Sequence, residues 1–295
     1  MTRISIVILT YNHEKFIGQN LAGIFSQAVD AAVEVIICDD HSQDQTDSEI
    51  TKSLENISYG FDVKYIRHSK NLGATPNFYF ALEQVTGDFV AFCEGDDYWT
   101  DPHKLQHQLD FLKNNPDYSM CFHAAQNIAD DPAVNGTLFS DIETRDYSQL
   151  EIYRHWIVHT ATVMMRSEVL RSAAKKVTMK DRSLQYFDTV LFLAAGSVGK
   201  IHGFEKVMSA YRRHDAGLSA GKVNYKRDLK HNKLDAVIGK YYKGKISKFS
   251  DWQIFTRSYR NFKSLLSEWK WKTALQYLPW LLRNRIIVYY FLKNR

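Results

Sequence analysis

The sequence predicts an α/β fold in which a mostly parallel sheet is flanked by helices. In residues 1–100, short runs rich in Ile and Val alternate with stretches whose apolar residues recur at helical spacing. The apolar runs are continuous rather than alternating, which is typical of strands buried on both faces. This alternation of strands and helices favours a parallel sheet with helices on both of its faces.

Four strands and three helices are expected in this first region. The strands are expected at 4–9, 33–38, 61–68 and 89–93, and the helices at 16–29, 47–54 and 77–85. A further helix is expected to begin with Asp101 as its N-cap and Pro102 at its first position. Beyond it we expect a strand at 157–165, a helix at 188–195, one or two strands at 200–211, and helices from about 223 onward.

The charge distribution divides the chain into two parts. The 295 residues are 45% hydrophobic and 24% charged, which excludes a disordered or collagen-like chain. Residues 222–295 contain 18 Lys and Arg against 4 Asp and Glu, which leaves 20 against 29 for residues 1–221. We therefore expect an acidic domain at 1–221 and a basic, aromatic, helical region at 222–295 whose partner is anionic.

The cysteines and the apolar runs bear on the compartment. Cys38, Cys93 and Cys121 are too few for a disulfide framework and lie among apolar neighbours, so we expect core thiols in a reducing cytosol. No signal peptide is recognisable, and the longest apolar run, Ile286–Leu292, is far shorter than the roughly 20 residues that span a bilayer. We expect a cytoplasmic protein, with a peripheral position on the inner face of the cytoplasmic membrane as a second possibility.

Polar residues gather where the predicted strands end. In an open parallel sheet, ligands bind beyond the carboxyl ends of the strands, and five carboxylates at one rim repel one another unless a cation or a donor-rich ligand offsets their charge. No glycine-rich phosphate loop follows the first strand, so a bound diphosphate needs a metal, for which Mg²⁺ or Mn²⁺ is suited. The cluster predicts a metal-bridged nucleotide. Its residues are Thr10, Tyr11 and Asn12 after the first strand, Asp39 and Asp40 after the second, and Glu94, Gly95, Asp96 and Asp97 after the fourth.

Six short motifs follow one another in a specific order. They are 7–12, 36–46, 71–73, 94–102, 187–188 and 211–214. Each motif is weak by itself, but their order and spacing resemble those of the inverting family-2 glycosyltransferases of the GT-A fold, over roughly residues 1–220. The resemblance implies a GT-A catalytic domain at 1–221, with 1–100 as its nucleotide-binding half and 101–221 as its acceptor-binding half.

The resemblance also implies the contacts to the donor. The Thr-Tyr-Asn loop and the Asp-Asp turn are similar to nucleobase and ribose contacts of the family, and Glu-Gly-Asp stands in place of its Asp-x-Asp motif. The implied donor contacts are Thr10, Tyr11, Asn12, Asp39, Asp40, Lys70, Asn71, Glu94, Gly95 and Asp96. UDP is the expected nucleotide by frequency alone, since nothing in the sequence separates uracil from guanine.

Metal ligands, a base and acceptor contacts follow from the same resemblance. Asp96 and His214 match positions that hold Mn²⁺ or Mg²⁺. Asp188 matches the catalytic base, although Phe187 stands where the family usually has Glu or Gly. Further candidates for contact with the acceptor are Asp97, Trp99, His159 and Thr162.

Structural interpretations of several of these residues stay open. Ser42 with Gln45 fits a helix capping box, Asp188 fits a helix N-cap, Tyr98 and Trp99 fit core packing, and a lone His214 fits a structural role.

The expected function is transfer of a hexose or N-acetylhexosamine from a UDP-sugar to a hydroxyl of a lipid-linked saccharide, with inversion. We expect this reaction to serve the assembly of polysaccharide, lipopolysaccharide or capsule. Two rival functions remain. One is a catalytically silent nucleotide-sugar or carbohydrate binder. The other is a nucleotidyltransferase, which normally needs a Gly-rich basic loop that the first strand lacks here.

The basic C-terminal region carries its own pattern. Apolar residues recur at spacings of three and four from Trp252 to Trp269, which marks one face of a helix, and Lys and Arg lie between them. Two interpretations remain open. The helix packs on the catalytic domain or on a second subunit, or residues 252–295 bind an anionic membrane surface. Nucleic acid is not an expected partner.

Overall fold

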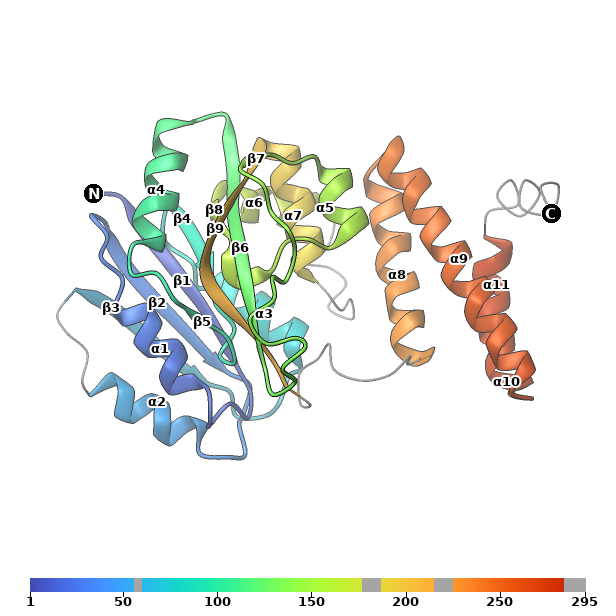
Figure 1. Cartoon of the computed structure of the whole chain (residues 1–295), viewed down its shortest axis with the longest axis horizontal. Helices are drawn as coiled ribbons and strands as arrows, with labels where there is room; N and C mark the ends of the chain where they lie inside the picture. The colour runs from blue at the N-terminus through green and yellow to red at the C-terminus, as the bar shows by residue number, and fades with distance from the viewer. Residues whose placement is uncertain (56–59, 177–186, 215–224, 284–295) are drawn as a thin grey trace. The chain divides into compact units, whose positions relative to one another are not determined.

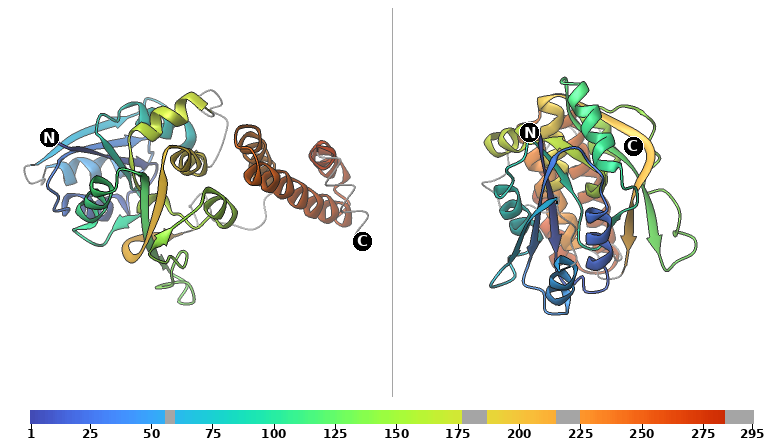
Figure 2. Two further views of the ribbon diagram at one scale, coloured as in Figure 1. Left: turned by 90° about the horizontal axis from the view of Figure 1, so that it is seen from above. Right: turned by 90° about the vertical axis from the view of Figure 1, so that its left-hand side faces the viewer.

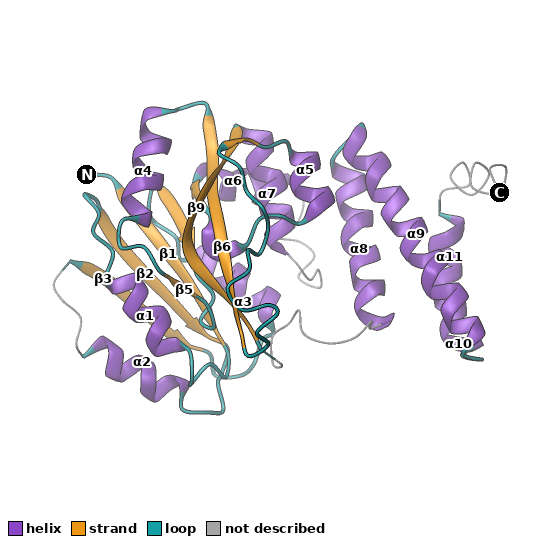
Figure 3. Ribbon diagram, in the orientation of Figure 1, coloured by secondary structure: helices purple, strands orange, loops and turns teal. Residues whose placement is uncertain are grey.

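The computed structural model describes residues 1–55, 60–176, 187–214 and 225–283 (Figure 1). Its internal contacts divide the chain into two compact units, and each is described by itself. The first unit comprises Met1–Arg182 and Phe187–Ala220, and the second comprises Ser183–Tyr186 and Gly221–Arg295. Strands are confined to the first unit within the described residues, and the second is built from helices (Figure 3).

A nine-stranded sheet forms the centre of the first unit. Its order is β3-β2-β1-β4-β8-β6-β9-β5, and β7 pairs with β9. The strands are β1 (Arg3–Thr10), β2 (Ala32–Asp39), β3 (Phe61–Arg67), β4 (Phe89–Phe92), β5 (Tyr98–Trp99), β6 (Tyr118–Ala129), β7 (Arg145–Asp146), β8 (Met164–Arg166) and β9 (Lys200–Arg213).

The sheet has a parallel half and a mixed half. β1 pairs in parallel with β2 and β4, and β2 pairs in parallel with β3, as the sequence predicts. β8 runs antiparallel to both β4 and β6, whereas β6 and β9 are parallel. In the parallel half Thr10 lies opposite Asp39, so the carboxyl ends of β1 and β2 meet at one edge.

Helices cover both faces of the parallel half (Figure 2). Leu21, Ile50 and Leu109 pack against one face of the sheet, and on the other face the Phe78 ring stacks on Phe92 with 5.7 Å between ring centroids. The helices of this unit are α1 (Ile17–Phe25), α2 (Thr46–Leu54), α3 (Ala74–Glu83), α4 (Lys104–Asn114), α5 (Gln149–His155), the 3₁₀ helix η1 (Thr160–Thr162), α6 (Glu168–Lys176) and α7 (Phe187–Val198).

The second unit has a small core of its own. Its helices are α8 (Tyr225–Tyr241), α9 (Lys245–Ser267), α10 (Trp271–Ala274), the 3₁₀ helix η2 (Leu275–Tyr277) and α11 (Leu278–Leu282). Leu265, Ala274 and Tyr277 are fully buried together, and the Arg257 side chain contacts Asp235 at 2.7 Å. Among the residues that the structure describes, no helix has both the length and the apolarity to cross a bilayer.

One predicted strand is wrong, and one predicted helix begins later than expected. The strand expected at 157–165 is a loop followed by η1, and only Met164–Arg166 is extended. The Thr162 hydroxyl donates to the His159 carbonyl at 2.6 Å, a local bond that competes with strand pairing. The helix expected from Asp101 begins at Lys104, because the Asp101 carboxylate accepts from the His103 N–H at 2.8 Å and holds a turn there.

The prediction of three buried, free cysteines is confirmed.

Two of these cysteines, Cys93 and Cys121, lie near a buried lysine, Lys104. Lys104 is fully buried, its ammonium lies 4.1 Å from the centroid of the Trp99 ring, and it donates to the Gln108 side-chain oxygen at 2.8 Å. No carboxylate lies within ion-pair distance of it in the described part of the chain. Burial lowers the pKa of Lys104 to about 7.

The buried Lys104 makes stability depend on pH. Because the pKa of Lys104 is lower in the folded than in the unfolded chain, Lys104 binds more protons in the unfolded chain above pH 7, and its contribution to stability rises with pH. This rise amounts to roughly 1.5 kcal/mol between pH 7.0 and 8.5. We expect Lys104→Met to remove it, as measured by urea unfolding of both proteins at the two pH values. An equal pH dependence of the two proteins would contradict the lowered pKa.

Candidate active site

Two loops at the carboxyl edge of the sheet are joined by side chains. Asn12, with φ of +56°, donates its backbone N–H to the Ser42 hydroxyl at 2.9 Å, and its side-chain oxygen accepts from the Gln43 N–H at 2.8 Å. Ser42 also hydrogen-bonds to Asp39. Helix α2 begins only at Thr46 and has no side-chain cap from Gln45, so the capping-box interpretation of Ser42 is wrong.

The adjacent residues Asp39 and Asp40 differ in what they can still bind. Asp39 is fully buried, and its Oδ2 has no hydrogen-bond partner in the described part of the chain, although Arg67 Nε lies 3.4 Å away. Both oxygens of Asp40 accept backbone N–H groups, from Leu72 at 2.6 Å and from Gly73 at 2.8 Å. Asp39 can therefore accept a hydrogen bond from a ligand, whereas Asp40 holds the loop that follows β3.

That loop carries two of the predicted donor contacts. Lys70 and Asn71 are both exposed on it. Tyr11, in the loop after β1, is 42% exposed, whereas Thr10 is buried and its hydroxyl has no hydrogen-bond partner among the residues that are described. The predicted donor residues of these loops therefore lie at the edge where the parallel strands end, with Thr10 and Asp39 at its floor.

The turn from Glu94 to Asp97 is held from beneath by helix α1. Asn20, fully buried on α1, donates its side-chain amide to the carbonyl oxygens of Glu94 at 2.8 Å and Asp97 at 2.9 Å. The Gly95 N–H donates to the Leu9 carbonyl at 2.8 Å. These bonds fix the backbone of the acidic turn against β1. Asn20 is not among the residues predicted for the site, because in the sequence it is only a polar residue on an apolar helix face.

Asp96 lies between two histidines. His214 Nε2 is 3.0 Å from Asp96 Oδ2, and His13 Nε2 is 3.8 Å from the same oxygen. Burial acts to raise the pKa of Asp96, but the hydrogen bond to His214 and the charge of His13 outweigh it and hold the pKa below its usual value. The structure thus brings together the predicted metal ligands Asp96 and His214, from opposite ends of the unit, and adds His13 to them.

Glu94 and Asp188 form a second part of the site. Burial, followed by the charges of Asp96 and Asp188, raises the pKa of Glu94 to about 8. Asp188 lies in the first turn of α7, and burial raises its pKa although backbone N–H groups of that turn stabilise its charged form. Glu94 Oε2 and Asp188 Oδ1 have no hydrogen-bond partner among the residues described.

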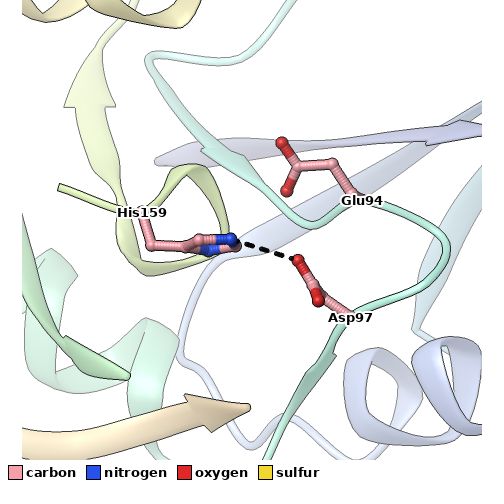
Figure 4. Close-up of side chains that lie close together, drawn as sticks. All are labelled: Glu94, Asp97 and His159. Atoms are coloured by element: carbon pink, nitrogen blue, oxygen red, sulfur yellow. Dashed lines mark ion pairs between the residues drawn. The ribbon is translucent and has the colours of Figure 1, made fainter. Parts of the chain in front are cut away.

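Glu94, Asp97 and His159 also offer ligand atoms within 4.8 Å of one another (Figure 4). Asp97 Oδ1 accepts from the Arg212 N–H at 2.8 Å. His159 Nδ1 accepts from the Ala161 N–H at 3.3 Å, and its Nε2 faces Asp97 Oδ2 at 3.4 Å. Asp97 and His159 thus support the acidic turn, and together with Glu94 they offer a second set of atoms that could hold a metal.

The predicted acceptor contacts differ in their placement. His159 is partly exposed and its ring lies 4.4 Å from the Tyr211 ring, centroid to centroid. Thr162 is buried in η1. Trp99 is 3% exposed, and its indole N–H donates to the Ala161 carbonyl at 2.9 Å. This burial corrects the acceptor prediction for Trp99, which packs in the core beneath the site.

Two further residues of the site were not predicted. His13 follows the Thr-Tyr-Asn loop directly, and Arg212 lies within the Tyr-Arg-Arg-His motif, so their positions in the sequence could have marked both. The Arg212 guanidinium donates to the Asp96 carbonyl at 2.9 Å and lies over the Phe16 ring at 4.7 Å. It joins β9 to the acidic turn.

The oxygen and nitrogen atoms at this edge of the sheet are suited to bind a divalent cation together with a nucleotide. Four buried oxygens at this edge lack hydrogen-bond partners among the described residues, and an unpartnered buried polar atom is unfavourable unless a ligand or water satisfies it. Carboxylate oxygens and a histidine nitrogen suit Mn²⁺, and carboxylates suit Mg²⁺. The four oxygens are Thr10 Oγ1, Asp39 Oδ2, Glu94 Oε2 and Asp188 Oδ1.

Comparison with known proteins places the chain in a family. Residues 5–173, more than half of the chain, match the model of glycosyl transferase family 2. The chain therefore belongs to glycosyl transferase family 2, and the resemblance inferred from its sequence motifs is confirmed.

Relatives differ in how much of them the chain covers. An uncharacterised protein of Mycobacterium tuberculosis (strain CDC 1551/Oshkosh) is 32% identical over 214 residues, which are 72% of this chain and 60% of that protein. The chain thus spans less than two thirds of the length of the mycobacterial relatives. The Escherichia coli UDP-Glc:alpha-D-GlcNAc-diphosphoundecaprenol beta-1,3-glucosyltransferase WfaP is 27% identical over 228 residues, which are 75% of this chain and 82% of that enzyme.

Solved structures share the fold. The Staphylococcus aureus TarS fragment 1–349 in complex with UDP-GlcNAc superposes with a TM-score of 0.68 at 20% identity, over 96% of this chain and 79% of that one. The mannosyltransferase PcManGT of Pyrobaculum calidifontis, in complex with GDP-Man and Mn²⁺, has a TM-score of 0.56 at 15% identity, over 93% of this chain and 73% of that one. The predicted GT-A fold with C-terminal helices is confirmed.

Gly95 provides a test of the packing at this edge. A Cβ atom built on Gly95 would lie 2.8 Å from Thr10 Oγ1 and 2.9 Å from His13 Nδ1, closer than real Cβ contacts. We expect Gly95→Ala to displace the acidic turn and to weaken nucleotide binding at least tenfold, as measured by isothermal titration calorimetry. Gly18→Ala is the control, because a Cβ there meets nothing within 4 Å. Equal affinities of the two variants would show that the turn tolerates the side chain.

Proposed function

We propose that the chain transfers a sugar from a UDP-sugar to a hydroxyl group of a saccharide, with inversion at the anomeric carbon. One observation carries the proposal: the partly buried Asp188 lies beside Glu94 with an unpartnered oxygen and a raised pKa. In this proposal residues 1–221 are the catalytic domain, with the donor on 1–100 and the acceptor on 101–221.

Asp188 is the proposed general base. A carboxylate whose pKa is raised holds a proton more tightly, so it accepts one from an attacking hydroxyl more readily. In a single displacement, the acceptor oxygen forms the new bond to the anomeric carbon while the bond from that carbon to the diphosphate oxygen breaks. The hydroxyl proton passes to Asp188 Oδ1, which has no other hydrogen-bond partner among the described residues.

The donor is proposed to bind along the ends of β1 and β2. Asp39 Oδ2 and Thr10 Oγ1 are both buried and have no hydrogen-bond partner among the described residues, and they suit the polar edges of a base and a ribose. Asn12 and Asp40 fix the two loops around them, and Lys70 and Asn71 are exposed where they can meet the phosphates or the sugar.

Asp96 and His214 would hold the proposed Mn²⁺ or Mg²⁺, with His13 beside them. A divalent ion bound there supplies positive charge to the departing diphosphate. This chain's own contribution is to keep the ligands in place: Asn20 fixes the turn from beneath and Arg212 fixes it from β9.

The relatives support the finer parts of the proposal. WfaP is named for UDP-Glc and for an acceptor linked to diphosphoundecaprenol, and TarS 1–349 was crystallised in complex with UDP-GlcNAc. We therefore propose a UDP-hexose or UDP-N-acetylhexosamine donor and a lipid-linked saccharide acceptor, as used in the assembly of bacterial surface polysaccharide.

Replacement of the base separates catalysis from binding. We expect Asp188→Asn to lower the rate of sugar transfer by about 10²–10⁴-fold, because general-base catalysis contributes on that order. The affinity for UDP should change less than twofold. Product is measured by mass spectrometry and affinity by calorimetry, with the exposed Asp110→Asn on α4 as the control. Loss of transfer and of UDP binding together would overturn the assignment, and a wild-type chain that binds UDP without forming product is a silent binder.

Removal of the proposed metal ligand is tested with nucleotides. UDP at 100 times its dissociation constant should stabilise the wild-type chain by about 2.7 kcal/mol in the presence of Mn²⁺, and EDTA should abolish the effect. Asp96→Ala should show a small thermal shift that is the same with Mn²⁺ and with EDTA. GDP and CMP serve as comparisons for the nucleobase. A Mn²⁺-dependent shift of wild-type size in Asp96→Ala would rule this residue out as a ligand.

A further inference from the structure

Exposed apolar side chains are concentrated in the second unit. Among the described residues twelve large apolar side chains are exposed, and eight of these lie between Tyr241 and Leu282. Single exposed apolar residues are normal on protein surfaces, but contiguous groups of them mark interaction sites. The arrangement of these eight side chains along the helices therefore decides whether some of them share a face.

Four of them lie on one side of a continuous helical run. Trp271, Leu275, Leu278 and Leu282 are spaced by four, three and four residues through α10, η2 and α11, and each is between 38% and 57% exposed. The opposite side of the same run carries Ala274 and Tyr277, which are fully buried against Leu265 of α9. This run therefore packs on α9 through one side, and its other, apolar side is exposed among the described residues of the unit.

Trp269 precedes this run, in the turn between α9 and α10. Its side chain is 89% exposed, and its φ is +57°, a conformation that favours Gly or Asn. The turn is closed by hydrogen bonds from the Trp269 N–H to the Leu266 carbonyl at 3.1 Å and from the Lys270 N–H to the Leu265 carbonyl at 2.8 Å. A large aromatic residue that is both strained and exposed gains little from folding, which points to a role outside the fold.

The charge of the unit favours an anionic partner. Described residues 225–283 contain 14 Lys and Arg and 4 Asp and Glu. Each of the four acidic side chains already contacts a basic one, in the pairs Asp228–Arg260, Asp235–Arg257, Asp251–Arg283 and Glu268–Lys270. The remaining positive charge includes exposed Lys263 and Lys272, which lie close in sequence to Trp269 and Trp271.

We propose that Trp269, Trp271, Leu275, Leu278 and Leu282, here called the lipid face, dock on the surface of an anionic phospholipid bilayer. Exposed Trp and Leu beside Lys are what an interfacial helix presents to headgroups and upper acyl chains. The lipid face differs from the face that the sequence predicts over 252–269, because Phe255 of that pattern is only 4% exposed. The proposal is independent of the proposed sugar transfer.

Vesicle flotation of the full chain tests the lipid face. We expect the wild-type chain to bind vesicles of phosphatidylcholine with 30% phosphatidylglycerol at least tenfold more strongly than vesicles of pure phosphatidylcholine. Raising the salt from 0.1 to 0.5 M should weaken this binding, because it screens the charges. Bromine-labelled lipids should quench Trp fluorescence only in the anionic vesicles.

Trp269→Gly is the decisive variant. Gly is suited to the φ of +57° at this position, so the variant keeps the turn while it removes the aromatic ring. We expect binding to anionic vesicles to fall about tenfold and unfolding temperature to stay or rise. The matched control is Trp156→Gly in the first unit, which also has a positive φ, of +50°, and a side chain that is 41% exposed. It should bind vesicles as the wild type does.

Lys263→Gln combined with Lys272→Gln tests the contribution of charge. Each Lys near an anionic surface strengthens binding severalfold, so this double variant should lose about tenfold or more in affinity for anionic vesicles. Binding to vesicles that is equal for the wild type and Trp269→Gly would overturn the proposal. So would a concentration-dependent dimer that Trp269→Gly abolishes, without vesicle binding, since the lipid face would then be a subunit interface.

Discussion

Like charges held close together are the constraint on which the first unit depends. Asp39, Glu94, Asp96 and Asp188 meet at the edge where the parallel strands end, and burial makes their mutual repulsion costly. The chain responds in two ways. Asp96 keeps a lowered pKa through His214 and His13, whereas the pKa of Glu94 rises to about 8. One rim therefore holds carboxyl groups with opposite protonation tendencies, as a site that binds a cation and moves a proton requires.

Buried polar groups of the surrounding elements hold this rim in place. Asn20 in α1, Arg212 in β9 and the Asp97–His159 pair all hold the backbone or side chains of one four-residue turn. Asp40 does the same for the loop after β3. Because these partners come from distant parts of the sequence, the acidic turn cannot move without disturbing several elements. Such preorganisation is what catalysis by fixed charges needs.

The second unit differs from the first in its small core and in its positively charged, partly apolar surface. Its core is small, with Leu265, Ala274 and Tyr277 at its centre, and its acidic residues are all engaged in ion pairs. Positive charge and exposed Trp and Leu remain on its surface. A surface of this kind suits a partner that is anionic and apolar at once, as a phospholipid bilayer is, and the first unit has no comparable face among its described residues.

The sequence by itself determined the parallel half of the sheet and the family, because both depend on local patterns: continuous apolar runs, and polar motifs at strand ends. It could not place β8, since the hydrogen bonds of His159 and Thr162 override the apolar pattern of 157–165. Asn20 carries no such pattern, and the motifs that contain or precede Arg212 and His13 mark their positions but not the contacts that they make. Their roles arise only when β9 and α1 pack beside the acidic turn, and that long-range packing is what the tertiary structure decided.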